Sequence, residues 1–169
     1  VARLRGGFGQ PPLVRLAAAE AMMEPLAGDM PALHQALRTL AKEIAERMPG
    51  LPASFLEVKR EGRLRLGIGS AGDEKIQLRV EGETAMPEDD LLVEVKEVRD
   101  LSGIPCLEQD PSREPDGYRI LSGISRLART PHPYAGYITL TPQAAARDFP
   151  RRRDPPRYFW VHAWPAEYR

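Results

Sequence analysis

The segment RLRLGIGSAGDEKIQLRVE, residues 63–81, decides the fold of this chain. Apolar and polar residues alternate on both sides of its glycines, and this alternation is typical of strands with one buried face. Gly67, Gly69 and Gly72 separate the two alternating runs. The sequence therefore predicts two antiparallel strands joined by a glycine-rich connection. A dinucleotide-binding fold would need a helix directly after the glycines, so the pattern argues against that fold.

A third strand, which carries a lysine, is predicted after this hairpin. In the run LLVEVK, residues 91–96, one face is formed by Leu91, Val93 and Val95, which should anchor the strand against a core. Lys96 should then point toward a cleft. Backbone N–H groups approach phosphate closely where side chains are small, so the predicted phosphate-binding residues are Gly67, Gly69, Ser70, Ala71, Gly72 and Lys96. The alternative interpretation is an ordinary glycine turn with a solvated lysine on an edge strand.

The rest of the chain predicts an α+β fold. Apolar spacing predicts two helices before residue 50, the first at 13–24 and the second ending near Met48, with Asp29 as its N-cap. Later patterns predict one helix at 116–129 and strands at about 54–60, 63–69, 74–81, 90–98, 134–140 and 157–163. We therefore expect a helical segment at 1–50, belonging to a larger domain, and a sheet unit at 51–169. The sheet should be antiparallel with one packed helix, and the two N-terminal helices should lie outside it.

The composition of the chain limits the kinds of partner that it can bind. Lysine plus arginine equals aspartate plus glutamate, 24 against 24, so no net basic field attracts nucleic acid. No apolar run reaches the roughly 18 residues of a membrane span, and the lone Cys106 cannot form an internal disulfide. These features predict a cytoplasmic protein that does not bind membranes. The chain starts at Val1 and ends at Arg169 just after an apolar strand, so we expect it to be a fragment of a longer protein.

Other polar residues have simpler interpretations. The acids at 88–90 should stay in water, and the arginines at 151–153 should lie in a solvated connection spanning 141–156, although they could also grip a phosphate. In the last strand, Tyr158, Trp160 and His162 should face one side, and Phe159 and Val161 the other. We interpret His162 as an ordinary strand residue in preference to a general base, because no orienting carboxylate is evident.

The order of these elements resembles the small lobe of protein kinases: a glycine hairpin, a lysine strand, a helix and two further strands. The resemblance implies that backbone groups of His162, Ala163 and Trp164 form a hinge that binds the adenine edge of ATP. In kinases the helix also supplies a glutamate for the strand lysine. Helix 116–129 has no acid in its body, which leaves Glu108 or Glu114 as the acid partner. The small residue that roofs the adenine in most kinases is replaced by Glu94.

A narrower resemblance covers residues 60–163. The runs LGIGSAG at 66–72, LVEVKEV at 92–98 and RILSG at 119–123 resemble a bacterial family of uncharacterised proteins in the kinase-like superfamily, the DUF2252-like proteins. The resemblance implies ATP and Mg²⁺ as cofactors and a small-molecule or protein substrate of unknown identity. Members of that family are longer, so their catalytic half would lie outside this segment, and we expect the segment alone to be inactive. The alternative function is a non-catalytic, degenerate kinase-like interaction module.

Overall fold

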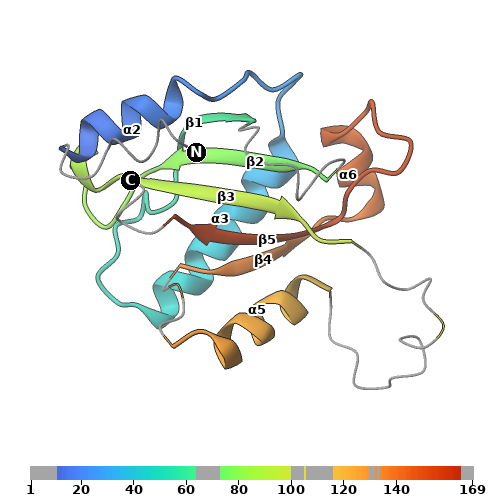
Figure 1. Cartoon of the computed structure of the whole chain (residues 1–169). Helices are drawn as coiled ribbons and strands as arrows, with labels where there is room; N and C mark the ends of the chain where they lie inside the picture. The colour runs from blue at the N-terminus through green and yellow to red at the C-terminus, as the bar shows by residue number, and fades with distance from the viewer. Residues whose placement is uncertain are drawn as a thin grey trace.

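An antiparallel sheet of five strands forms the centre of the described structure. The computed structural model describes residues 11–63, 73–99, 105, 116–129, 132 and 134–164. The strands are β1 (Val58–Arg63), β2 (Lys75–Val80), β3 (Leu91–Glu97), β4 (Gly136–Thr139) and β5 (Tyr158–Ala163). They lie in the order β1-β2-β3-β5-β4, and each neighbouring pair is antiparallel (Figure 1). The expected α+β class is confirmed, whereas the likeness to a kinase small lobe stays a prediction.

Helices cover both faces of this sheet. The described α-helices are α2 (Pro12–Glu20), α3 (Pro31–Arg47), α5 (Asp116–Leu127) and α6 (Pro142–Asp148), with a short 3₁₀ helix, η1 (Pro87–Asp89). In Figure 1, α3 crosses behind the sheet. Helix α2 lies in the upper part of the view and α5 in the lower part. The start of α5 lies against β4 and β5, because a Cβ on Gly117 would be 2.8 Å from the Cβ of Tyr137.

Helix α3 and the sheet share one hydrophobic core. The buried helix residues Leu33, Leu37, Leu40 and Ile44 join a cluster with apolar side chains of β2, β3, β4 and β5. At Gly136 in β4 a Cβ would overlap the side chain of Leu40, so the missing side chain allows the close approach. The prediction that both N-terminal helices pack outside the sheet unit is therefore wrong for α3. The apolar face of a sheet must be covered, and α3 covers it. The assignment of residues 1–50 to a larger domain stays a prediction.

A distant carboxylate caps α3. Asp29 does not cap this helix, since Met30 is the N-cap residue and provides no side-chain bond. Instead, the buried carboxylate of Asp148 accepts hydrogen bonds from the backbone N–H groups of Ala32 at 3.3 Å and Leu33 at 2.8 Å. These donors belong to the first turn, where the helix offers no acceptors of its own. Asp148 ends α6, a helix that lies where the sequence predicted a loop.

Two further expectations need correction. The strand predicted at 54–60 starts later, because residues 53–56 form turns and β1 begins at Val58. β1 continues to Arg63, and the remainder of the strand predicted at 63–69 lies outside the described residues and stays a prediction. The acid run at 88–90 does not stay in water throughout. Asp90 is 1% exposed and accepts hydrogen bonds from Lys59 at 2.6 Å and Arg79 at 2.7 Å. Two cations thus compensate the charge of this carboxylate and make its burial tolerable.

Candidate functional site

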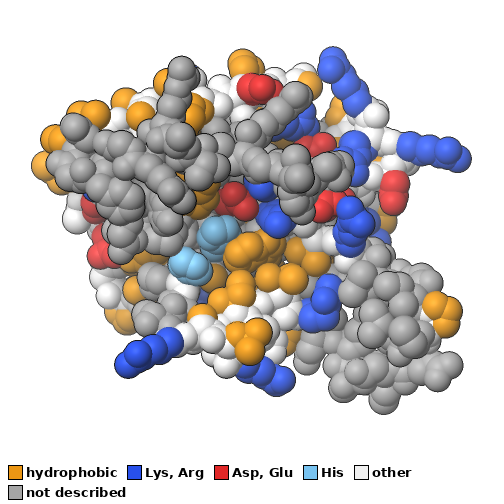
Figure 2. Space-filling view, viewed as in Figure 1, with side chains coloured by type: hydrophobic (Ala, Val, Ile, Leu, Met, Phe, Trp, Pro, Cys, Tyr) orange, Lys and Arg blue, Asp and Glu red, His pale blue; other side chains and the backbone are white. Residues whose placement is uncertain are grey.

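The sheet face opposite α3 brings charged and aromatic side chains together. Because successive residues of a strand point to opposite faces, this side of the sheet carries most of the polar side chains of the alternating runs, together with the buried Leu92. The register aligns Gln77, Glu94 and His162 in one row across β2, β3 and β5, and Lys75, Lys96 and Trp160 in the next. We call these six residues the polar face. Figure 2 views the molecule from this side and shows histidines beside hydrophobic side chains, with acidic and basic groups nearby.

Lys96 lies on the polar face as predicted from its strand. Leu91, Val93 and Val95 are buried in the core on the opposite side, which confirms their anchoring role. Lys96 itself is partly buried, with Lys75 and Trp160 as its register neighbours. Within the described part of the chain, no carboxylate lies within ion-pair distance of its ammonium group. The acid partner expected from Glu108 or Glu114 lies outside the described residues.

A contact between a carboxylate and an imidazole on two strands occupies the centre of the polar face. Glu94 Oε1 lies 3.7 Å from His162 Nε2, and both side chains are only 14% exposed. Burial by itself would raise the pKa of the Glu94 carboxyl. The contact with His162 and the charges of Lys75 and Lys96 outweigh burial, so the pKa of Glu94 is lowered. Glu94 is therefore ionised at neutral pH.

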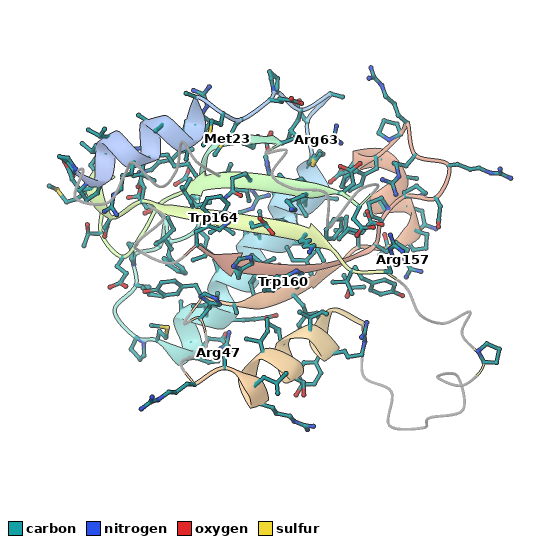
Figure 3. The ribbon with its side chains drawn as sticks, viewed as in Figure 1. Met23, Arg47, Arg63, Arg157, Trp160 and Trp164 are labelled. Carbon is teal, nitrogen blue, oxygen red and sulfur yellow. The ribbon has the colours of Figure 1, made fainter. Side chains whose placement is uncertain are left out.

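His162 also belongs to an aromatic stack. Its ring is nearly parallel to that of Trp160, with centroids 4.2 Å apart and planes at 10°, and the ring of His132 lies 5.4 Å away. Figure 3 shows Trp160 in the middle of this side of the sheet. Tyr158, Trp160 and His162 are partly exposed while Phe159 and Val161 are buried, which confirms the predicted facing of the last strand. A charge and a flat aromatic surface thus lie side by side.

Gln77 is a buried amide. It is 0% exposed, and among the described residues neither its Nε2 nor its Oε1 has a hydrogen-bond partner. Leaving such a group unpaired costs about 1–3 kcal/mol in proteins. Sequence reasoning missed Gln77, because a polar residue in an alternating strand is expected to face solvent. Its register neighbours on β1 and β3 are Gly62 and Glu94.

The predicted phosphate loop lies outside the described residues, but both of its ends are described. Gly67, Gly69, Ser70, Ala71 and Gly72 belong to this connection between β1 and β2. At its ends, Arg63 pairs with Glu74 at 2.7 Å, and the N–H of Glu74 donates to Glu97 Oε2 at 2.7 Å. Glu97 directly follows Lys96, and Lys75 is the register neighbour of Lys96, so the connection ends beside the lysine, whereas it starts on β1, with β2 in between.

Arg152 contacts the same two acids, Glu74 and Glu97, at this end of the sheet. Arg152 lies 3.3 Å from Glu74 Oε1 and 3.7 Å from Glu97 Oε2, whereas Arg151 and Arg153 are exposed. The connection at 141–156, which was predicted to be solvated, thus contains helix α6. It also contributes Arg152, which pairs with Glu74 and Glu97. Burial raises the pKa of Glu97, because the Glu74 N–H and the Arg152 charge only partly offset it.

The three predicted hinge residues continue the sheet. His162 and Ala163 belong to β5, and the N–H of Trp164 donates to the carbonyl oxygen of Leu92 at 2.7 Å. The Trp164 N–H is therefore already engaged and not available to an adenine ring. Figure 3 shows Trp164 near the start of β3. An adenine-binding role for His162, Ala163 and Trp164 stays a prediction.

Metal ligands do not gather in the described part of the chain, where no three His, Cys, Asp or Glu side chains are placed to hold an ion. None of the described helices combines the length and apolar character needed to cross a membrane. The chain matches no model of a known protein family, and neither curated proteins nor solved structures give a significant match.

Proposed function

We propose that this chain is the nucleotide-binding lobe of a kinase-like phosphotransferase, with Lys96 and the glycine connection as its phosphate site. The observation that supports the proposal best is the position of Lys96. It lies on the polar face beside Lys75, the first residue of β2, and so beside the end of the connection that contains Gly67, Gly69 and Gly72. The described elements also follow the order inferred from the sequence: a hairpin, a lysine strand, helix α5 and two strands.

The chemistry of this corner suits a phosphate. Backbone N–H groups of a glycine-rich connection can approach phosphate oxygens without steric hindrance, and Lys96 and Lys75 supply two neighbouring positive charges. Phosphate contacts to cations are charge-assisted and are stronger than neutral hydrogen bonds. The nearby Glu74 and Glu97 would repel an anion, but Arg63 and Arg152 pair with them. The segment is proposed to hold ATP and Mg²⁺, while the catalytic groups and the metal ligands would come from elsewhere in a longer protein.

One observation favours the alternative, a degenerate kinase-like module that binds a partner without catalysis. Glu94 replaces the small residue expected above an adenine ring, and its contact with His162 keeps a carboxylate on this part of β3. Helix α5 also lacks an acid in its body to position Lys96. Under this alternative, the glycines and the lysine persist without nucleotide binding.

Calorimetric titration of the purified chain with ATP and Mg²⁺ separates the two functions. Lys96→Ala removes one charge-assisted contact, worth on the order of 1.5–3 kcal/mol, and should weaken ATP binding roughly ten- to a hundredfold. Gly69→Val should block the approach of phosphate to the backbone. Thermal melting of each variant checks that the fold is retained.

Two matched variants serve as controls. Arg47→Ala removes a cation from the last turn of α3, on the opposite side of the sheet, and should leave ATP affinity unchanged. Gly28→Val adds a side chain where a Cβ would meet nothing within 4 Å, so it tests the steric effect of valine alone. If wild type does not bind ATP, or if Lys96→Ala and Gly69→Val bind as wild type does, the phosphate site is rejected in favour of the interaction module.

A further inference from the structure

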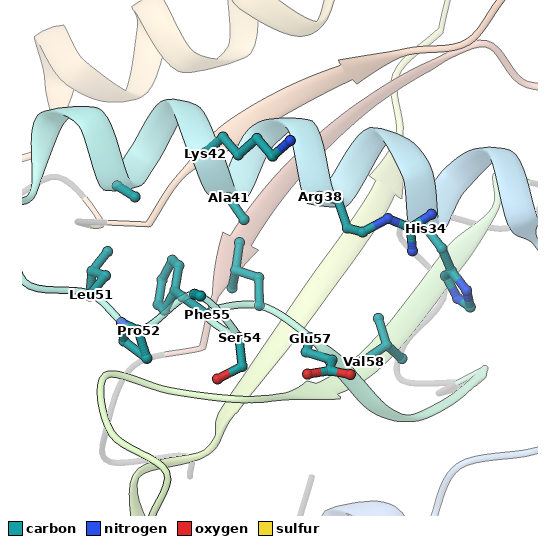
Figure 4. Close-up of a pocket in the computed structure, with 13 residues that line it drawn as sticks. His34, Arg38, Ala41, Lys42, Leu51, Pro52, Ser54, Phe55, Glu57 and Val58 are labelled. Atoms are coloured by element: carbon teal, nitrogen blue, oxygen red, sulfur yellow. The ribbon is translucent and has the colours of Figure 1, made fainter.

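A cavity lies on the side of the molecule away from the polar face. This cavity of about 570 Å³ separates α3 from the segment at 51–58 that leads into β1. Its helix wall consists of His34, Arg38, Ala41, Lys42 and Ala45. Figure 4 shows α3 along one side of this groove and the 51–58 segment along the other. Since α3 covers the face opposite the polar face, the groove is separate from the proposed phosphate site.

The groove is apolar at one end and charged at the other. In Figure 4, Ala41 lies above Leu51, Pro52 and Phe55, whereas His34 and Arg38 extend toward the other end of the groove. The side chain of Lys42 runs along the helix toward Arg38. The wall from His34 to Ala45 spans 11 helical steps, or about 16.5 Å at 1.5 Å per residue. An extended, amphipathic molecule fits this polarity better than a compact one.

The side chains His34, Arg38 and Lys42 of the groove differ in whether an acid faces them. His34 Nε2 lies 2.7 Å from Glu61 Oε2, so an acid already faces it. Arg38 donates to the neutral amide oxygen of Gln35 at 2.7 Å and 3.3 Å. Within the described residues, neither Arg38 nor Lys42 has a carboxylate at ion-pair distance. Glu57 is the acid that lines the groove itself, on the opposite wall. Arg38 and Lys42 therefore give the groove two positive charges that remain available to an anion.

The opposite wall contains the one strained backbone position among the described non-glycine residues. Leu56 has φ +62°, a left-handed conformation that a leucine rarely adopts. Its N–H donates to the carbonyl oxygen of Glu81 at 3.1 Å, and its side chain is 3% exposed, which together hold the conformation. Strained residues of this kind cluster at ligand sites, where the surrounding structure enforces them. The wall is thus fixed in shape by the core beneath it.

We propose that this groove binds a small organic carboxylate with an extended apolar chain. The carboxylate would pair with Arg38 and Lys42, and the chain would lie against Ala45, Leu51 and Phe55. The planar guanidinium of Arg38 can hold both oxygens of a carboxylate, which a point charge cannot do. The cavity volume falls within the range of about 300–1,000 Å³ that is usual for small-molecule sites.

Octanoate provides a direct probe of this site. Titration of the full 169-residue chain should shift backbone NMR signals of residues 34–45 and 51–58. Octanamide has the same chain and no charge, and it should bind at least tenfold more weakly. Arg38→Gln should weaken octanoate binding at least tenfold, and adding Lys42→Gln should weaken it further. Arg47→Gln, on the same helix outside the groove, should have no effect.

A second variant tests the apolar end. Ala45→Trp adds a large side chain to the lining of the groove and should reduce octanoate affinity at least tenfold, while thermal melting shows whether the chain remains folded. The proposal is overturned if octanoate and octanamide bind equally, if neither binds, or if Arg47→Gln weakens binding as much as Arg38→Gln. These measurements involve neither ATP nor Lys96, so their failure would leave the phosphate site untouched.

Discussion

The two faces of the central sheet are built from the same strands but carry different chemistry. Toward α3, β2, β3 and β5 present apolar side chains that are completely or almost completely buried. On the polar face, the same strands present lysines, a glutamate, a glutamine, a histidine and a tryptophan. The first face excludes water, so only apolar side chains that pack well can occupy its positions. On the second face this constraint holds for Leu92, which packs with Leu16, Ala19 and Met23, whereas the neighbouring polar positions can carry binding groups.

The polar face is nevertheless not a solvated surface. Gln77 is completely buried, and Glu94 and His162 are each 14% exposed. A polar residue in an alternating strand thus indicates which face it occupies, but not whether water reaches it. Because the polar face is also partly buried, each polar contact on it affects stability more than a contact in water would.

The largest contrast should appear between neighbours on β5. Phe159 is 0% exposed and lies against Phe149 with ring centroids 5.8 Å apart, so Phe159→Ala should cost about 3–5 kcal/mol of unfolding free energy. Trp160 is only partly buried on the polar face, and Trp160→Ala should cost clearly less. Urea unfolding of both variants measures the difference. Equal losses would mean that the polar face contributes to the core as strongly as the α3 face.

The next effect concerns the cap of α3. Asp148→Ala leaves the N–H groups of Ala32 and Leu33 without their acceptor, and it should cost about 1–3 kcal/mol of unfolding free energy. Asp29→Ala removes the residue that sequence rules favour as the cap, and it should stay within about 0.5 kcal/mol of wild type. Chemical denaturation of the two variants tests the assignment, and the reverse order of losses would restore Asp29 as the cap.

These cases show how far the sequence predicts the fold. The alternation in β2, β3 and β5 predicts strands and facing, because burial of one face is a local property of the pattern. The Asp148 cap could not be predicted, since the acceptor and the Leu33 donor are 115 residues apart. Helix α6 left a local signal that was overlooked: Thr141 caps it through the Ala144 N–H, and Pro142 occupies its first turn.

The candidate site, like the fold, was predictable from the sequence only in part. Strand periodicity places Lys96, Trp160 and His162 on one side of their strands. The pairing of Glu94 with His162 depends on β5 lying next to β3, although β4 comes between them in the chain. Periodicity carries no information on that order of strands. The compensation of Asp90 by Lys59 and Arg79 also depends on tertiary contacts, which is why an acid in a polar run was expected in water.

A substitution at Gln77, on the polar face, should raise the unfolding free energy, whereas the substitutions above lower it. Gln77→Met keeps the length of the side chain and removes an amide that has no partner among the described residues. Relief of this burial cost should raise the unfolding free energy by about 1–2 kcal/mol. Thermal and urea unfolding measure the gain. For comparison, Leu78→Met changes the adjacent position on the apolar face and should give no gain, because Leu78 is already packed in the core.

A loss of stability in Gln77→Met would show that the amide has a hydrogen-bond partner in solution. The same variant can be titrated with ATP, since a buried amide beside Glu94 could also serve a ligand. If Gln77→Met is more stable and binds ATP as wild type does, the amide has no role in the proposed phosphate site.

The smallest effects should be those of pH on two acids of β3. The pKa of Glu94 is lowered, so its contribution to stability is complete above its usual value of 4.5 and is lost as the pH falls through the lower folded value. The stability difference between wild type and Glu94→Gln should therefore shrink as the pH falls from about 6 to 3. The pKa of Glu97 is raised, and ionising it opposes folding. Its difference from Glu97→Gln should shift in favour of wild type over the same decrease in pH.

The opposite signs follow from the partners of the two acids. At Glu94 the strongest influence that opposes burial is the contact with His162, so His162→Gln should reduce the pH dependence of the Glu94→Gln difference. The same change should leave the Glu97 difference unaltered, because the groups that act on Glu97 are Asp73, Glu74 and Arg152. Urea unfolding at each pH gives the four differences. If both acids respond to pH with the same sign, or if His162→Gln alters both equally, the charges on the polar face are not organised around the Glu94–His162 pair.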